Sequence, residues 1–205
     1  MDQLKEKSRK AFDAQAADYD RTEKGAHARR LYPHVRAALE GVREGGLLDV
    51  GCGTGALARL VLEQGPKRRV TGVDLAPAMV AQARANLAGF GGRAHVMEAD
   101  SERMPFHEES FDAAYCNDSF HHYPDPEKAV FEIWRVMRPG GLLVVGDCTL
   151  PAPVRAVMNA SLRFSSEGDV RIYSKGEYER ILGRWFSSVA WRRVEGSACL
   201  VEARK

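Results

Sequence analysis

The sequence predicts a doubly wound α/β fold of three layers, built on a mostly parallel seven-stranded sheet with an antiparallel strand pair at its C-terminal end. One observation is an alternation along the chain, in which short apolar runs alternate with longer segments of helical periodicity. Another is the run at 140–148, which reads as a buried strand of the kind that helices cover on both faces. Finally, two strand-like runs at the end of the chain are separated by Gly196, which predicts the antiparallel pair.

Local patterns justify each element in order. Leu57, Leu60 and Val61 recur at helical spacing before Gly65 ends that helix, and Pro77 begins the next one. The predicted helices span residues 2–17, 26–40, 56–65, 77–92, 126–137 and 174–185. The predicted strands span residues 45–51, 68–75, 93–100, 111–117, 140–148, 187–195 and 197–205. Right-handed crossovers between parallel strands then place helices on both faces of the sheet.

The chain divides into four segments of one domain. Residues 1–40 are expected to form helices that cap a ligand site, and residues 41–148 form the α/β core. Residues 149–173 break the strand–helix rhythm with two prolines and a short amphipathic stretch, which predicts an inserted lid or substrate segment. Residues 174–205 complete the domain with a helix and the antiparallel strand pair.

Composition excludes several classes of function. Thirty basic and 28 acidic residues leave a net charge of +2, so no strong field favours nucleic acid or an anionic membrane. No apolar run is long enough to span a bilayer, and the charged start of the chain does not resemble a secretory signal. We therefore expect a cytoplasmic protein with a small-molecule partner, and the sequence leaves the oligomeric state open.

The four cysteines indicate neither a disulfide framework nor a zinc site. Cys52, Cys116, Cys148 and Cys199 are widely separated and form no CxxC pair, so reduced and mostly buried thiols are expected.

A glycine loop follows the first strand of the predicted core. Gly51, Cys52, Gly53, Thr54 and Gly55 remove side chains from a strand-to-helix turn, so that its backbone can approach a ligand. The loop alone does not identify that ligand. Together with Ala56, its glycines also satisfy the loose dinucleotide fingerprint, so a nicotinamide-dependent oxidoreductase remains an alternative.

Two carboxylates lie at the ends of the next two strands. Asp74 ends the second strand, where a carboxylate can accept hydrogen bonds from both hydroxyls of a ribose. Asp100 ends the third strand, where an acceptor can pair with the amino group of an adenine. Each also has a purely structural explanation, because Asp74 precedes a helix and Asp100 precedes a tight turn.

These segments together resemble the class I S-adenosylmethionine-dependent methyltransferases, which have a Rossmann-like fold. Within that class they are most similar to the type 11 small-molecule group, which includes quinone-biosynthesis C-methyltransferases. The resemblance runs from about Phe12 to Val145. The segments that carry it are LLDVGCGTG, GVDLAPAMV, EADSERMPF, FDAAYCNDSFHHYPD and FEIWRVMRPGGLLVVGD.

The resemblance implies a methyltransferase that binds S-adenosylmethionine and releases S-adenosylhomocysteine. It also implies a role for particular residues. Around the methionine end of the cofactor it places Asp49, Gly51, Cys52, Gly53, Gly55 and Asn117, with Tyr19 closing over the cofactor. Around the nucleoside it places Asp74 on the ribose, Leu75 and Met79 beside the adenine, and Asp100 and Ser101 at the adenine edge.

The acceptor side is less defined. Methyl transfer requires an aligned nucleophile, and a base assists a hydroxyl, phenol or carbon acid. His121 and His122 follow the fourth strand where such a base would lie, although packing at that turn is the plainer explanation. A metal site of these histidines with Cys116 and Asp118 matches no usual zinc spacing, and no metal is expected.

The acceptor itself stays open. Arg155, Arg163 and Arg171 of the inserted segment suit an anionic acceptor if they converge, and otherwise a solvated helix face. Two further alternatives keep the cofactor, namely a binding protein that acts as a sensor and an enzyme of different group-transfer chemistry.

Overall fold

The computed structural model describes residues 3–205, so residues 1 and 2 of the predicted N-terminal segment lie outside the described residues. Within that range seven strands form one sheet in the order β3-β2-β1-β4-β5-β7-β6. Neighbouring strands from β3 to β5 run parallel, and β7 runs antiparallel to both β5 and β6. The predicted fold class is confirmed.

The elements lie close to the predicted bounds. The strands are β1 (Glu44–Val50), β2 (Lys67–Asp74), β3 (Ala94–Glu98), β4 (Phe111–Asn117), β5 (Met137–Cys148), β6 (Ser188–Arg193) and β7 (Ala198–Arg204). The α-helices are α1 (Gln3–Gln15), α2 (Ala26–Ala38), α3 (Ala56–Gln64), α4 (Pro77–Leu87), α5 (Pro126–Val136), α6 (Ala152–Ser161) and α7 (Lys175–Leu182). Short 3₁₀ turns are η1 (Tyr19–Arg21), η2 (Glu23–Gly25), η3 (Ala88–Arg93), η4 (Phe120–His122) and η5 (Leu162–Phe164).

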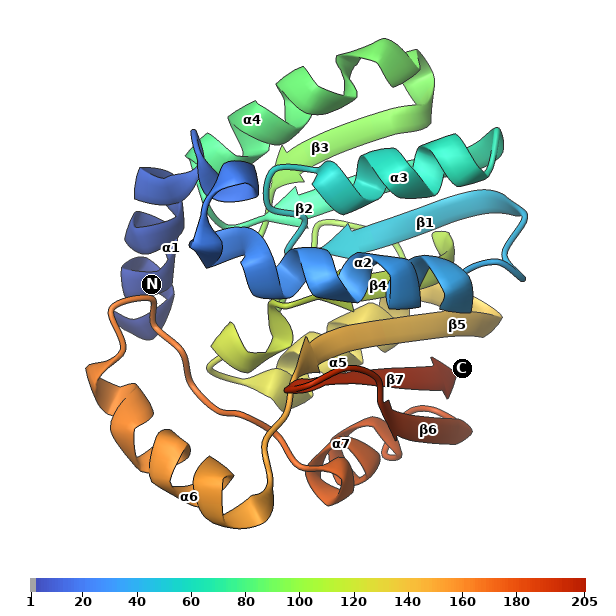
Figure 1. Cartoon of the computed structure of the whole chain (residues 1–205). Helices are drawn as coiled ribbons and strands as arrows, with labels where there is room; N and C mark the ends of the chain where they lie inside the picture. Colours follow the sequence, from blue (N-terminus) through green and yellow to red (C-terminus); the bar gives the residue numbers. More distant parts are fainter. Residues whose placement is uncertain (1–2) are drawn as a thin grey trace.

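Helices cover both faces of the sheet (Figure 1). Successive side chains of a strand point to opposite faces, and β1 shows this directly. Leu47 packs with α2, α3 and α4, whereas Leu48 packs with α5 and α7 on the other side. Both side chains are fully buried, which is why β1 reads as a continuous apolar run rather than an alternating one.

The strand order reverses beside β1. Its neighbours are β2 on one side and β4 on the other, so the loops that leave β1 and β4 diverge above the sheet. In open α/β sheets this switch point leaves a crevice at the carboxyl ends of the strands. The glycine loop and the segment after β4 therefore lie where a ligand site is expected.

Three predicted boundaries differ from the structure by three residues or more. The helix predicted at 77–92 ends at Leu87 and is followed by η3, and the helix predicted at 174–185 ends at Leu182. The fifth strand begins at Met137 rather than at residue 140, directly after α5. Met137 pairs with Phe111, and the register then shifts so that Leu142 pairs with Ala113. The irregular start of β5 accommodates Pro139, which cannot donate a ladder hydrogen bond.

The inserted segment forms α6 and η5 apart from the sheet, and the chain after them runs up to the N-terminal helix (Figure 1). None of the residues of α6 is buried, and Val157 and Phe164 are 71% and 75% exposed. The chain then passes closely against α1, where a Cβ on Gly168 would lie 3.0 Å from Leu4 O. Gln15 Nε2 of α1 donates to Glu167 Oε1 over 2.9 Å. A role for this segment as a lid remains a prediction.

No helix of residues 3–205 has the length and apolar character needed to cross a bilayer. The four cysteines are free thiols, three of them buried.

Candidate functional site

The glycine loop turns the chain sharply from β1 into α3. Gly51 and Gly53 have φ angles of 73° and 52°, in the left-handed region that favours glycine. A Cβ on Gly51 would lie 2.3 Å from Ser119 Oγ, whereas a Cβ on Gly53 would have no neighbour within 4 Å. Gly51 thus lets the loop after β4 approach closely, and Gly53 leaves free space above the turn.

Gly55 has a different role in the same loop. A Cβ there would lie 3.0 Å from Leu87 Cδ1 and 3.2 Å from Ala83 Cβ, both on α4. Gly55 therefore permits close packing against α4, and it lines neither of the two hollows described next.

Two adjoining hollows lie at the carboxyl ends of the strands. The first, of about 590 Å³, lies at the ends of β2 and β3 beneath α1. The second, of about 540 Å³, lies between the glycine loop, α2 and the end of β4. They share Phe12, Gly51, Asp74 and Ser119, so together they form one continuous site.

Most of the site residues predicted from the sequence line these hollows. The first hollow is lined by Gly51, Asp74, Leu75, Asp100, Ser101 and His122. The second is lined by Tyr19, Asp49, Gly51, Cys52, Gly53, Asp74, Met79 and Asn117. Two predicted residues, Gly55 and His121, lie outside both linings. The structure thus brings the predicted residues to one place, while their individual roles stay predictions.

Two buried acceptors in the second hollow have no hydrogen-bond partner. They are Asp49 Oδ2 and Asn117 Oδ1. The Tyr115 hydroxyl lies beside the Asp49 carboxyl, and it too has no partner of full hydrogen-bond geometry among residues 3–205. Burial raises the pKa of Asp49 to about 8, although the neighbouring Tyr115 hydroxyl acts in the opposite direction. Unpaired buried acceptors are costly, so this pair favours a ligand that brings donors or positive charge.

Asp74 is tied to the backbone around it. Its Oδ2 accepts from Gly53 N over 2.8 Å, and its Oδ1 accepts from Ala76 N over 2.9 Å. Burial raises the pKa of Asp74, and these backbone donors counteract that rise. Each carboxylate oxygen keeps a second acceptor site, so Asp74 can hold the loop and still accept hydrogen bonds from a ligand.

Asp100 already has a cationic partner. Lys5 Nζ of α1 lies 2.7 Å from Asp100 Oδ2 and also contacts Glu102 at 2.5 Å. Asp100 Oδ1 accepts from Glu102 N over 2.9 Å, so the turn-capping role suggested by the sequence is present as well. Lys5 closes the first hollow from above and is a site residue that sequence analysis missed.

The histidine pair after β4 is surrounded by carboxylates. His121 Nδ1 lies 2.5 Å from Asp147 Oδ1 at the end of β5, and its Nε2 lies 3.4 Å from Asp169 Oδ1 of the inserted segment. Burial lowers the pKa of His121, but the two carboxylates outweigh it and leave that pKa well above its usual range. Burial and the charge of His121 together lower the pKa of His122 to about 4.

A third histidine, His27 of α2, was not predicted; it lines neither hollow but contacts Asp118, which lines the second. His27 Nδ1 lies 2.6 Å from Asp118 Oδ1, and His27 Nε2 is buried with no partner among the described residues. The hydrogen bond to Asp118 outweighs burial and raises the pKa of His27. Asp118 has a φ of 56°, which is unusual for a residue other than glycine. A lone histidine 91 residues before its partner gives no sequence signal.

The arginines of the inserted segment do not converge on the site. Arg155 donates to Leu150 O over 2.8 Å, Arg163 lies over the ring of Phe164, and Arg171 donates to Glu177 over 2.7 Å. None of them lines either hollow.

The geometry agrees with comparisons to known proteins. Residues 48–145 match the model of a family described as a methyltransferase domain. A malonyl-[acyl-carrier protein] O-methyltransferase of Geobacter sulfurreducens is 34% identical over 186 residues, which cover 87% of this chain and 68% of that protein. The chain belongs to this methyltransferase family. Its resemblance to the class I, type 11 methyltransferases is thereby confirmed.

A second relative is named as a methyltransferase of a quinone precursor. A demethylmenaquinone methyltransferase of Thermus thermophilus is 41% identical over 99 residues, which cover 48% of this chain and 45% of that protein. The chain spans about half the length of most of the curated relatives it matches.

Solved structures share the methyltransferase fold. A methyltransferase in complex with the Haloferax volcanii Trm112 activator has a TM-score of 0.77 and 22% identity, with 94% of this chain and 96% of that chain covered. The [4+2]-cyclase SpnF has a TM-score of 0.75 and 22% identity, with 90% of this chain and 84% of that chain covered. At such identities the likeness concerns the fold, and SpnF shows that one fold serves more than one reaction.

Proposed function

We propose that this protein transfers the methyl group of S-adenosylmethionine to a small-molecule acceptor. The observation that carries the proposal is the pair of unpartnered buried acceptors, Asp49 Oδ2 and Asn117 Oδ1, whose residues line the second hollow together with Gly53. The methionine end of this cofactor carries an ammonium and a sulfonium, and both suit such acceptors. When bound, the cofactor supplies an electrophilic methyl group.

The nucleoside half of the cofactor fits the first hollow. Asp74 would accept from the ribose hydroxyls, and Asp100 and Ser101 would meet the adenine edge. Leu75 would flank the ring from the first hollow, and the buried Met79, which lines the second hollow, would approach it from that side. Tyr19 and Phe12, whose ring centroids are 6.1 Å apart, would cover the site from the N-terminal side and exclude water.

The acceptor needs a base where its nucleophile carries a proton. The sequence offered His121 and His122 for this role, and the structure adds His27. Asp118 fixes the His27 ring through Nδ1 and leaves Nε2 free, which is the arrangement of an oriented general base. His121, by contrast, has carboxylates at both ring nitrogens. We therefore place His27 ahead of the other two.

His27 is also near the methionine end of the site. The adjacent Ala28 lines the second hollow, and its carbonyl accepts from Asn117 Nδ2 over 3.3 Å. Alignment of the acceptor by these groups would supply much of the rate, since near-attack geometry removes a large part of the barrier.

Calorimetric titration with S-adenosylmethionine, followed by detection of S-adenosylhomocysteine, tests the proposal. The acceptor panel should hold phenols, quinols, amines and carboxylic acids. We expect saturable binding, no binding of NAD, and S-adenosylhomocysteine with at least one acceptor class. Binding without product across the panel favours a sensor, and stabilisation by NAD alone contradicts the proposal.

A further inference from the structure

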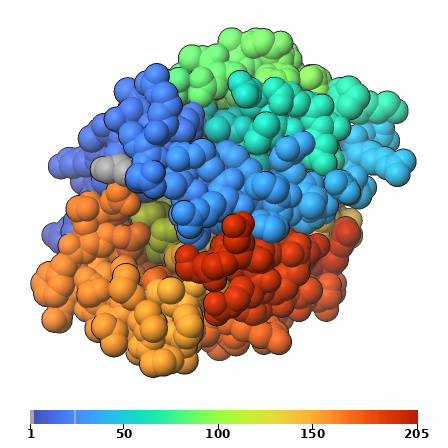
Figure 2. Space-filling view, in the orientation of Figure 1, coloured from blue at the N-terminus to red at the C-terminus, as the bar shows by residue number. Residues whose placement is uncertain are grey.

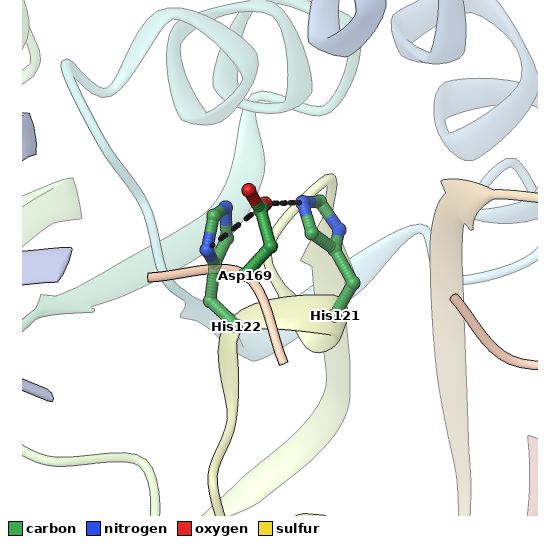
Figure 3. A group of neighbouring side chains, drawn as sticks. All are labelled: His121, His122 and Asp169. Atoms are coloured by element: carbon green, nitrogen blue, oxygen red, sulfur yellow. Dashed lines mark ion pairs between the residues drawn. The ribbon is translucent and has the colours of Figure 1, made fainter. Parts of the chain in front are cut away.

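Two neighbouring imidazoles and a carboxylate converge beside the first hollow. Figure 3 shows the rings of His121 and His122 turned toward the Asp169 side chain between them. His121 Nε2 lies 3.4 Å and His122 Nδ1 lies 3.5 Å from the same oxygen, Asp169 Oδ1. The ring centroids are 4.1 Å apart, and the three donor atoms lie within 4.8 Å of one another.

These separations do not match direct hydrogen bonds. A nitrogen–oxygen hydrogen bond spans about 2.7–3.2 Å, which is shorter than both contacts. Two ligands of one tetrahedral ion with bonds of about 2.1 Å lie about 3.4 Å apart. The two separations to Asp169 Oδ1 therefore match those between ligands of a common ion, and the two imidazole nitrogens lie within 4.8 Å of each other.

His122 supplies an independent observation. Its side chain is only 9% exposed, and Nδ1 has no hydrogen-bond partner among residues 3–205. An ion pair of His121 with its carboxylates accounts for His121 alone. It leaves unexplained why a second buried ring aims a bare nitrogen at the same carboxylate.

The surroundings hold the three side chains in place. Asp147, fully buried, contacts the far nitrogen of His121 at 2.5 Å and also accepts from His121 N over 3.0 Å. A carboxylate on the distal nitrogen is the usual partner of a metal-bound histidine. Val170 N donates to His121 O over 2.8 Å, which fixes the inserted segment, and Asp169 with it, beside the histidines.

We propose that His121, His122 and Asp169 bind one divalent transition-metal ion of the zinc type. Two imidazoles and one carboxylate suit zinc, iron(II) and their neighbours and suit magnesium poorly. Three protein ligands leave a coordination position open, as at catalytic rather than structural zinc sites. Because His122 lines the first hollow, that position adjoins the cofactor site. The proposal does not depend on methyl transfer.

Sequence analysis expected no metal because it considered only neighbours along the chain, Cys116 and Asp118. Neither belongs to this site, and Asp169 comes from the inserted segment. A competing donor set exists nearby, since His121, Asp147 and Cys148 also lie within ligand distance of one another. The experiment must therefore distinguish Asp169 from Cys148.

Calorimetric titration of the chelator-treated full chain with Zn²⁺ tests the proposal, with Mg²⁺ as a second arm. We expect one equivalent of Zn²⁺ to bind and Mg²⁺ not to bind. Asp169→Asn and His122→Gln should each weaken Zn²⁺ binding by more than about tenfold, and Asp147→Asn by about 10–100-fold. Metal content after purification should follow the same order.

Two control variants each remove a possible metal ligand that lies outside the proposed site. His95→Gln changes an exposed histidine of β3, and Cys148→Ser removes the competing thiol; both should leave Zn²⁺ affinity unchanged. Thermal unfolding of each metal-free variant checks that it folds. The proposal is overturned if the parent chain binds no Zn²⁺, if Asp169→Asn and His122→Gln bind it normally, or if Cys148→Ser alone abolishes binding.

Discussion

The two sides of the site are built in different ways. On the cofactor side, the glycine loop, Asp74 and Asp100 follow β1, β2 and β3 in sequence order and are held by backbone hydrogen bonds. On the proposed acceptor side, His27, Asp118, His121, Asp147 and Asp169 come from α2, the single segment between β4 and α5, the end of β5 and the inserted segment. Figure 2 shows the recess between them, with yellow-green atoms of the middle of the chain at its base between the blue N-terminal helices and the orange inserted segment.

The two sides therefore differ in how far the local sequence determines the position of their residues. Strand ends of a parallel sheet meet at one edge, so a short motif after each strand is enough to place a cofactor. The acceptor side depends on tertiary contacts between distant segments. Variants on the first side should therefore change cofactor affinity, and variants on the second should change turnover and leave that affinity unchanged.

The largest effect is expected for Gly51→Val. The valine side chain would overlap Ser119, and the valine backbone would have to keep a φ of 73°, which a β-branched residue rarely adopts. We expect S-adenosylmethionine affinity to fall by more than about a hundredfold, since strained backbone and steric overlap each cost about 1–3 kcal/mol. Gly176→Ala in α7, where nothing lies within 4 Å, is the matched control and should bind normally in the same calorimetric titration. Normal binding by Gly51→Val would refute the place of the loop in the site.

The next effect should lie on the acceptor side alone. His27→Gln removes the proposed base, and we expect S-adenosylhomocysteine formation to fall about a hundredfold, at the lower end of general-base contributions. Cofactor affinity should not change, whereas His34→Gln on the same helix should alter neither quantity. Equal losses of affinity and turnover in His27→Gln would mean that the two sides are not separable.

Asp49 is expected to make cofactor affinity depend on pH, with a change of about tenfold. Because burial raises its pKa to about 8, the carboxyl is mostly protonated in the folded, ligand-free protein at neutral pH. Affinity for the cofactor ammonium should then rise about tenfold between pH 6 and pH 7 and level off above pH 8. Asp49→Asn should bind more weakly and show a flatter profile in titrations at several pH values.

The same group predicts the pH dependence of stability. The unfolded carboxyl ionises at a pKa of about 3.9, so the raised pKa of folded Asp49 lowers the free energy of unfolding as pH rises from about 4 to about 8. Asp49→Asn should remove part of this decline in denaturant melts at pH 5 and pH 8. An unchanged decline would show that Asp49 ionises freely in the folded state.

The smallest effect is expected in the inserted segment. Phe164→Ser replaces a side chain that is 75% exposed, so the free energy of unfolding should change by less than about 0.5 kcal/mol. Leu143→Ala in the core should cost about 2–5 kcal/mol in the same denaturant melts. A large loss of stability in Phe164→Ser would mean that α6 and η5 are part of the folded core.

Sequence patterns placed the fold and the cofactor side more fully than the acceptor side. The fold class follows from alternating periodicity and right-handed crossovers, and the glycine loop identifies the first strand end. The irregular start of β5 was missed because the predicted strand began at Gly140, after Pro139. The pairings of Lys5 with Asp100 and of His27 with Asp118 join residues 95 and 91 positions apart, which no local pattern contains.

The ion pairs of Lys5 have a kinetic consequence. Lys5 bridges Asp100 and Glu102, and Asp13 of the same helix accepts from Ala78 N, so α1 is fastened across the first hollow at two points. Opening of these bonds would widen the exit for a molecule bound beneath α1. We therefore expect the lifetime of bound S-adenosylhomocysteine to shorten as ionic strength rises, because added salt weakens the partly exposed pair with Asp100. Release of S-adenosylhomocysteine, rather than methyl transfer, would then be the rate-limiting step.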